Sequence, residues 1–373
     1  MAKSDIVSLI ESNRIIICCG SGGVGKTTIS AALAIKAACL GKRAVVITID
    51  PAKRLATSLG LEALSSTPTD LSERLASALK ANNLPALRGK LFAVMPDTAQ
   101  TFEKFVRSMA GKDEALAHRV LKNSIYKIFA KEFSGANEYM AMEKLHQIAT
   151  EEAFDLIVLD TPPSANTSAF LEAPDTLAVF FDDRIIKWFI KPGSKLVAAG
   201  LKMALEILEK LTGHGFISEL IEFATALFEL RTQFMINLKT VSDLLHQKEV
   251  SFLMVTSPER LSKNDTLEFV SNLSPRGLRF WGFIINRVLS RRIGIENVEK
   301  IDLTALGKTV DAADASILLK NFGLLHPALE HEKDATRYLR SISRKNSSVI
   351  FVPEQQQDVH SIDSLLNVSQ GLS

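Results

Sequence analysis

Short apolar runs recur along the chain and are separated by segments with helical periodicity. Several runs are β-branched and apolar throughout, which is typical of strands that are covered on both faces. Alternation of such strands with helices predicts an α/β fold with a doubly wound, mostly parallel sheet. The predicted strands are residues 14–19, 43–49, 91–95, 155–160, 251–256, 280–286 and 348–352.

Two long stretches, residues 98–150 and 164–248, carry helical patterns without a convincing strand. Within the second stretch, the segment 216–238 places apolar residues on one side at helical spacing. These residues are Ile217, Leu220, Ile221, Ala224, Leu227 and Phe228. We therefore expect a helical subdomain beside the α/β core. We also expect the chain after about residue 367 to be frayed, as chain ends commonly are.

Composition narrows the class of protein. The 373 residues carry a formal net charge of +2 and three cysteines, and no CxxC occurs. We expect no nucleic-acid binding, no zinc site, and cysteines buried as small apolar residues in a cytoplasmic protein. No signal peptide and no membrane span are predicted, because charged residues interrupt the most apolar stretch, 177–192. The sequence leaves open whether the protein contacts a membrane surface peripherally.

Residues Gly20–Thr27 read GSGGVGKT and satisfy the pattern G-x-x-x-x-G-K-[ST] between a predicted strand and a predicted helix. Glycines allow backbone N–H groups to converge on phosphate oxygens. Lys26 can neutralise phosphate charge, and the Thr27 hydroxyl can bind Mg²⁺. The N-terminus of the following helix adds its dipole. A phosphate-binding loop is therefore predicted here.

Two aspartates follow predicted strands. Asp160 ends the strand 155–160, where phosphate-loop proteins place an acid that holds Mg²⁺, often through water. The next segment, 161–174, is stiffened by prolines and suits a γ-phosphate sensor. Asp50 lies at the end of the second strand, where it can polarise an attacking water. Asp50 can instead cap the helix that begins near Pro51, and the two roles can coexist.

Three segments together resemble the arsenical-pump ATPase family, which includes the cytosolic ATPase that targets tail-anchored membrane proteins. GSGGVGKTT, IDPAKRLATSLG and DLIVLDTPPSANTSAFLEAP resemble its phosphate loop, first switch and second switch. The likeness spans almost the whole chain in the family's order. It continues at FSGANEYMAMEKL, VTSPERLSKNDTLEFV, GFIINRV and FVPEQQQDVHSIDSL.

The resemblance implies a phosphate-loop NTPase core that binds ATP and Mg²⁺. It assigns Asp50 to the attacking water, Asp160 with Thr27 to the metal, and Asn286 to the adenine edge. From the residues alone, Asn286 would be interpreted as a turn former after a strand. Pro353 and Gln355 would line the adenine pocket. The phosphate-binding residues would be Gly22, Gly23, Val24, Gly25, Lys26, Thr27 and Thr28.

The sequence also departs from that family. Ser21 occupies a position where the family carries a lysine that reaches a partner subunit's phosphates. Three explanations stay open: another cation such as Lys53 or Arg54 replaces it, a paralogous partner donates it, or hydrolysis is slow. Asn166 stands where tail-anchor targeting members carry histidine, and their zinc-binding CxxC and the arsenite-binding cysteines are not evident.

The expected function is Mg²⁺-dependent ATP hydrolysis by a homodimer, or by a heterodimer with a paralogue. Nucleotide-driven switching would rearrange the helical subdomain, which would engage a protein partner or hydrophobic cargo. The alternatives are a low-turnover regulatory module and, less favoured, the ATPase subunit of an arsenite pump. In the predicted division, residues 1–97, 151–175 and 249–373 form the nucleotide-binding core, and residues 98–150 and 176–248 form the inserted helical subdomain.

Overall fold

The structure is a computed structural model, and two compact units make up the chain. The first unit comprises Met1–Met95, Ala153–Ser168 and Lys248–Ser373, and the second comprises Pro96–Glu152 and Ala169–Gln247. The described residues are 5–48, 54–126, 136–151, 153–161, 169–180, 215–293, 312–343 and 347–372.

The first unit contains an eight-stranded sheet with the order β3-β4-β2-β5-β1-β6-β7-β8. Every neighbouring pair is parallel except β3 and β4, so the predicted doubly wound α/β class is confirmed. All seven predicted strands are present, and only the two-residue β3 lacked a sequence signal. The strands are β1 (Ile15–Cys19), β2 (Arg43–Thr48), β3 (Thr69–Asp70), β4 (Lys90–Val94), β5 (Leu156–Asp160), β6 (Val250–Thr256), β7 (Phe280–Val288) and β8 (Ser348–Pro353).

The central strand β1 lies between β5 and β6, and this order brings distant segments together. Cys18 pairs with Asp160 of β5, and Cys19 pairs with Met254 of β6. The strands run in the same direction, so their carboxyl ends meet at one edge of the sheet. In open α/β sheets, that edge is where ligands bind.

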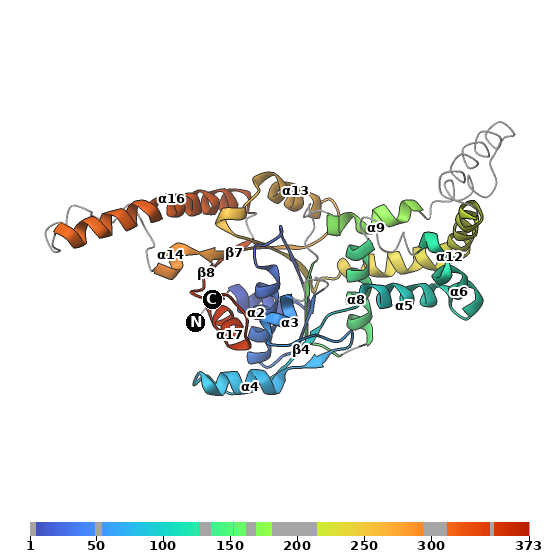
Figure 1. Ribbon diagram of the computed structural model, residues 1–373, viewed down its shortest axis with the longest axis horizontal. Helices are drawn as coiled ribbons and strands as arrows, with labels where there is room; N and C mark the ends of the chain where they lie inside the picture. The colour runs from blue at the N-terminus through green and yellow to red at the C-terminus, as the bar shows by residue number, and fades with distance from the viewer. Residues whose placement is uncertain are drawn as a thin grey trace. The chain divides into compact units, whose positions relative to one another are not determined.

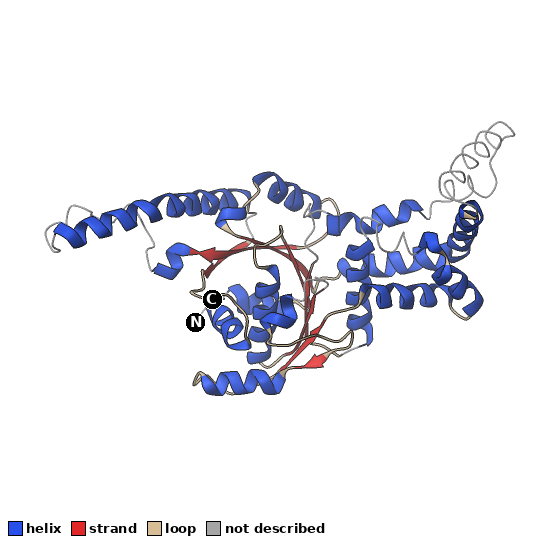
Figure 2. Ribbon diagram, viewed as in Figure 1, coloured by secondary structure: helices blue, strands red, loops and turns tan. Residues whose placement is uncertain are grey.

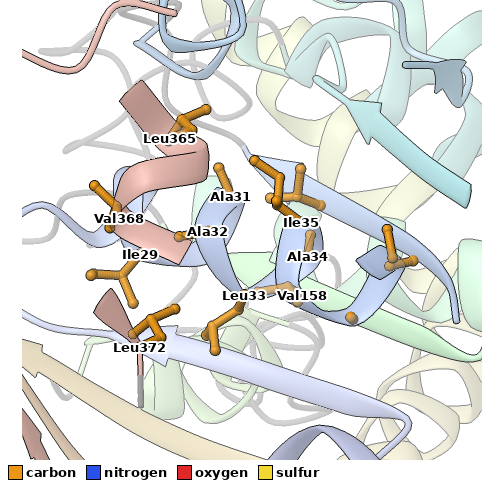
Figure 3. Close-up of a cluster of buried hydrophobic side chains, with 14 of the residues drawn as sticks. Ile29, Ala31, Ala32, Leu33, Ala34, Ile35, Val158, Leu365, Val368 and Leu372 are labelled. Atoms are coloured by element: carbon orange, nitrogen blue, oxygen red, sulfur yellow. The ribbon is translucent and has the colours of Figure 1, made fainter. Parts of the chain in front are cut away.

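Helix α2 (Lys26–Cys39) follows β1 and is buried on almost every side. Its sequence alternates small alanines with Ile29, Leu33 and Ile35, which lets neighbouring elements approach closely. The sheet curves around it (Figure 2), and α17 (Ile362–Gly371) packs along its other side (Figure 3).

The predicted fraying of the C-terminal tail is wrong. Leu365, Val368 and Leu372 are at most 1% exposed and pack against α2. Ser361 caps α17 by accepting a hydrogen bond from the Ser364 backbone N–H. The apolar residues of α17 are spaced one helical turn apart, so the helix is held by burial against α2 rather than by its position near the end of the chain.

Of the remaining helices of this unit, α13 lies on the face of the sheet opposite α2 (Figure 1). Glu332 of α16 is buried and accepts hydrogen bonds from the backbone N–H groups of Leu289 and Ser290 at 2.8 and 3.3 Å. The carboxylate thus caps α14 at the end of β7. These helices are α1 (Asp5–Ser12), α3 (Arg54–Ser58), α4 (Ser72–Ala81), η1 (Pro258–Arg260), α13 (Lys263–Leu273), α14 (Leu289–Ile293) and α16 (Ala312–Ile342).

The described residues of the second unit form helices joined by short turns, without a strand, and have a separate core. Phe105 packs edge-on against Tyr139 at 5.4 Å and against Phe234 at 5.8 Å between ring centroids. No helix among the described residues is both long and apolar enough to cross a membrane. The helices are α5 (Thr98–Ala110), α6 (Glu114–Lys122), α8 (Ala136–Glu151), α9 (Ala169–Phe180) and α12 (Phe216–Leu245).

Helix α12 forms where the sequence predicts it, but the predicted apolar stripe is only partly correct. Ile221 and Phe228 are 46% and 39% exposed, whereas Phe223, Leu230 and Phe234 are buried. The helix is apolar over more than one face, so periodicity alone does not select the buried one. The aromatic contacts of Phe234 with Phe105 and Tyr139 decide the orientation.

Burial raises the pKa of the Glu143 carboxyl in α8 to about 7, and the Tyr139 hydroxyl one turn earlier offsets part of the rise. Between pH 4.5 and 7 the folded protein therefore holds a proton that the unfolded chain has released. Stability should fall as pH rises through this window, and the loss should be complete above pH 7.

Glu143→Gln should remove this dependence and raise the unfolding free energy at pH 8 by about 3.5 kcal/mol at most, since each pKa unit corresponds to about 1.4 kcal/mol. Urea unfolding at pH 5 and pH 8 measures it. Glu151→Gln, at the exposed end of the same helix, is the matched control. An equal pH dependence of Glu143→Gln and wild type would contradict the prediction.

Candidate nucleotide site

The loop between β1 and α2 has a backbone that only glycine accommodates at its last turn. Gly25, the residue before α2, has φ +92°. A Cβ at this position would lie 2.2 Å from Nδ2 of Asn286. Val24 is fully buried and anchors the loop, so its side chain contributes packing rather than ligand contact. The loop therefore leads directly into the N-terminus of α2, where free backbone N–H groups can bind an anion.

Lys26, the first residue of α2, bends back over this loop. Its Nζ donates to the carbonyl oxygens of Gly20 and Ser21 at 2.7 and 3.1 Å, and the residue is only 6% exposed. A buried ammonium group is costly unless charged or polar partners surround it. The loop carbonyls hold the Lys26 ammonium group at the centre of the loop, where a phosphate would meet it.

The Asp160 carboxylate connects three segments of the chain. It is 1% exposed, and Oδ2 accepts hydrogen bonds from the hydroxyl groups of Thr27 and Thr48 at 2.7 and 2.8 Å. Thr27 belongs to the loop, and Thr48 ends β2, two residues before Asp50. The next residue, Thr161, donates its hydroxyl to the Cys18 carbonyl at 2.9 Å. Asp160 thus links β5 to the phosphate loop and to the strand that leads to Asp50.

Asn286 lies at the other side of the loop. It is 7% exposed, and its Nδ2 donates to the Val24 carbonyl at 2.9 Å. The residue therefore joins the carboxyl end of β7 to the phosphate loop. Gln355 follows β8 and donates its Nε2 to the Pro353 carbonyl at 2.9 Å. This contact closes a turn at the end of β8.

These residues surround a cleft of about 700 Å³, which is within the range of small-molecule sites. The predicted residues that line it are Gly23, Gly25, Lys26, Thr27, Thr28, Asp160, Asn286 and Gln355. Gly22, Val24 and Pro353 adjoin the cleft without lining it. Asp50, Lys53 and Asn166 lie outside the described residues, and Arg54 begins α3.

Comparison with known proteins identifies the family. Residues 13–302 match the model of the family described as "Anion-transporting ATPase", which is more than half of the chain. The chain belongs to this family. Its members are ATPases, and a doubly wound sheet with the loop between β1 and α2 is consistent with that class.

Three relatives from this comparison illustrate the likeness. The chain is 29% identical over 280 residues to "Putative arsenical pump-driving ATPase 2" of Aquifex aeolicus, covering 74% of this chain and 80% of the relative. It is 23% identical over 384 aligned positions to "ATPase ASNA1 homolog" of Plasmodium berghei, covering 99% and 90%. An arsenical pump-driving ATPase of Prosthecochloris vibrioformis, also named as putative, is 25% identical, covering 77% of this chain and 64% of the relative.

The cleft also contains residues for which the sequence predicted no role. Glu259 and Arg260 come from η1 after β6, Arg287 follows Asn286, and a further group comes from Gln357–His360 after β8. Glu259, Arg260 and the group after β8 follow the carboxyl ends of parallel strands, and Arg287 is the second-last residue of β7. This position near strand ends is a sequence feature that could have indicated these residues, because ligands bind at the carboxyl edge of such sheets.

The donor groups fit a nucleotide with Mg²⁺. Thr27 and Asp160 offer a hydroxyl and a carboxylate at hydrogen-bond distance, and such oxygen ligands suit Mg²⁺. The Lys26 ammonium group and the N-terminus of α2 provide positive potential beside them. Within the described residues, no cluster of three or more histidines, cysteines or acids with the geometry of a metal centre occurs.

Proposed function

We propose that this chain binds Mg²⁺-ATP in the cleft and hydrolyses it, with the nucleotide state controlling the helical unit. The observation that carries the proposal is the convergence of Lys26, Thr27 and Asp160 at the N-terminus of α2. Membership of a family of ATPases supports it. Two of the relatives are named as putative ATPases that drive arsenical pumps.

The residues divide the chemistry among them. Lys26 would exchange its contacts with the Gly20 and Ser21 carbonyls for phosphate oxygens, with little movement of the ammonium group. Thr27 and Asp160 would hold Mg²⁺, which neutralises phosphate charge and orients the terminal phosphoryl group. Asp160 would act through water, because its carboxylate is buried beneath the two threonine hydroxyls. Asp50 would position the attacking water, and Asn286 and Gln355 would face the adenine ring.

Asp160 also suggests how the nucleotide state reaches the helices. A hydroxyl oxygen can bind a metal through a lone pair while it still donates its proton, so Thr27 and Thr48 could both keep their hydrogen bonds to Oδ2, and a displacement of Thr27 toward a metal would act directly on Asp160. The chain runs from Asp160 through residues 161–168 directly into α9 of the helical unit. A shift of β5's end would therefore be passed to α9 through the covalent chain. In this proposal the chain works as a dimer, and its helical unit binds a protein partner or a hydrophobic cargo.

Asp50→Asn should lower ATP turnover by about 100-fold or more while leaving ATP binding within a few-fold of wild type, because the amide cannot polarise water. Phosphate release with Mg²⁺ over a wide range of chain concentration measures turnover. Glu73→Gln, an exposed change on α4, is the control. A specific activity that rises with chain concentration would indicate self-association. If wild-type phosphate release does not exceed the rate without protein, ATP hydrolysis is refuted.

The cargo proposal has a separate test. Binding of an apolar-surface dye should differ among the ATP-bound, ADP-bound and nucleotide-free protein, because a rearranged helical unit would cover different apolar side chains. Identical dye binding in the three states would contradict nucleotide control of that unit.

A low-turnover regulatory module is the second candidate, and the specific observation that favours it is Ser21. The serine side chain is too short to reach another subunit's phosphates as a lysine does. A contribution of the arginine-finger type is worth roughly 10³–10⁵ in rate, so its loss would leave binding intact but turnover slow. Tight ATP binding without turnover at any chain concentration would support this candidate.

The cysteines weigh against thiol-based arsenite binding. Cys18 and Cys19 are fully buried on β1, and burial raises the pKa of the Cys18 thiol to about 12 and that of Cys19 as well. Cys39 is half-buried on α2, and burial also raises its pKa. Neutral, buried thiols are poor ligands for a metalloid, because the thiolate is the form that binds.

A further inference from the structure

The phosphate loop lies between two basic side chains that come from different parts of the chain. Lys26 provides one cation at its base. The structure shows a second basic side chain at the part of the loop that follows Ser21. It is Arg260, the last residue of η1, for which the sequence predicted no role.

Arg260 reaches the loop because of the strand order. β6 lies directly beside β1, with Met254 opposite Cys19, so the turn after β6 emerges beside the phosphate loop. The Arg260 Nη1 donates to the Gly22 carbonyl at 3.4 Å. A Cβ built on Gly23 would lie 3.2 Å from both Cζ and Nη1 of Arg260. The guanidinium group therefore lies against Gly22 and Gly23, directly after Ser21 in the chain.

The backbone that presents Arg260 is fixed. Pro258 is buried, and the Arg260 backbone N–H donates to the Ser257 carbonyl at 3.1 Å. Two residues later, Ser262 caps α13 by accepting from the Asp265 N–H. The Tyr338 hydroxyl of α16 then donates to the Lys263 carbonyl at 2.8 Å. These contacts hold the base of the side chain while the guanidinium group itself is exposed in the cleft.

The contact with Gly22 is long for a hydrogen bond, and a neutral carbonyl is a weaker acceptor than a phosphate oxygen. A guanidinium group carries five donors in a planar fork that matches phosphate geometry. Arg260 can therefore keep its position and exchange one weak acceptor for charged ones. Resting on the function proposed above, we propose that Arg260 supplies, from the same chain, a second phosphate-stabilising cation beside Lys26.

The first test compares Arg260→Ala with Arg279→Ala. Arg279 is an exposed arginine that also donates Nη1 to a backbone carbonyl, that of Lys248, at the opposite end of β7 from Asn286. Arg260→Ala should lower single-turnover ATP hydrolysis by about 100-fold or more, as expected for a cation on the transferred phosphoryl group. Arg260→Lys should recover part of the rate, and Arg279→Ala should match wild type. Unfolding midpoints show whether each variant is folded.

The second test asks whether Arg260 acts in its own subunit. Lys26→Met and Arg260→Ala proteins are mixed, and turnover is measured at high chain concentration. If Arg260 acts within its own chain, no mixed dimer holds a complete site, and mixing restores nothing. If it acts on the partner's nucleotide, random mixing should restore about a quarter of wild-type turnover, because half of the dimers are mixed and each has one complete site. That recovery would overturn the same-chain assignment.

The outcomes separate this proposal from the proposed function. Wild-type hydrolysis with an unchanged Arg260→Ala rate would overturn the role of Arg260 and leave the ATPase in place. Absent wild-type hydrolysis would refute the ATPase, and binding would then decide the role of Arg260. In that case Arg260→Ala should weaken the binding of ATP and of ADP about tenfold and leave the binding of AMP unchanged, as measured by calorimetry. Equal affinity of wild type and variant for all three nucleotides would overturn the proposal.

Discussion

Lys26→Met is expected to lower ATP turnover by roughly 10³-fold and to weaken ATP binding. The methionine keeps most of the side-chain length but removes the ammonium group, which contacts the carbonyls of Gly20 and Ser21 and is only 6% exposed. At so buried a position, water cannot replace the lost charge when phosphates enter. Phosphate release and calorimetric ATP binding, both with Mg²⁺, measure the two effects.

Lys36→Met provides the matched control, since it removes the same charge from the same helix. Lys36 lies ten residues further along α2, about 15 Å from Lys26 at the helical rise. Its variant should turn over ATP at the wild-type rate. If Lys26→Met retained turnover within three-fold of wild type, the loop would not be the phosphate site.

The second large effect concerns stability, and it contrasts two glycines of the same loop. Gly20 has φ +149°, and a Cβ there would lie 2.1 Å from the Val255 carbonyl oxygen. Val255 belongs to β6, so the obstacle is strand backbone that cannot turn aside. Gly20→Ala should therefore destabilise the protein by about 2–6 kcal/mol, combining backbone strain with overpacking. A Cβ on Gly22 meets nothing within 4 Å, and Gly22→Ala should change stability by less than about 1 kcal/mol.

Urea unfolding of the two alanine variants, followed by circular dichroism, tests this contrast. The expected order of midpoints is wild type, then Gly22→Ala close to it, then Gly20→Ala far below. Similar midpoints for the two variants would show that the end of β6 can move away from the loop.

Much of the site could be predicted because its parts are local in sequence. The phosphate loop is a contiguous segment whose glycines, Lys26 and Thr27 have a meaning set by the strand before them and the helix after them. Asp160 was recognisable for the same reason, since it ends an apolar run that is typical of a buried parallel strand. These residues line the cleft or border it in the structure.

Other residues gave no such local signal. Nothing in the sequence around Arg260 indicates a neighbour 238 positions earlier, yet the guanidinium group contacts Gly22. The same holds for Asn286, whose amide group joins β7 to the loop at Val24. Both contacts follow from the placement of β6 beside β1 and of β7 beside β6, and strand order is a property of the assembled sheet.

The sequence by itself determined seven of the eight strands, the phosphate loop and the α/β class, because residue periodicity and glycine conformation act over a few neighbouring positions. Only the tertiary structure decided which face of α12 is buried and that α17 is held against α2. It alone brought Arg260, Thr48 and Glu332 to their partners. The physical reason is that burial and hydrogen bonding between distant segments depend on which surfaces meet, and several surfaces of similar apolarity compete for each contact.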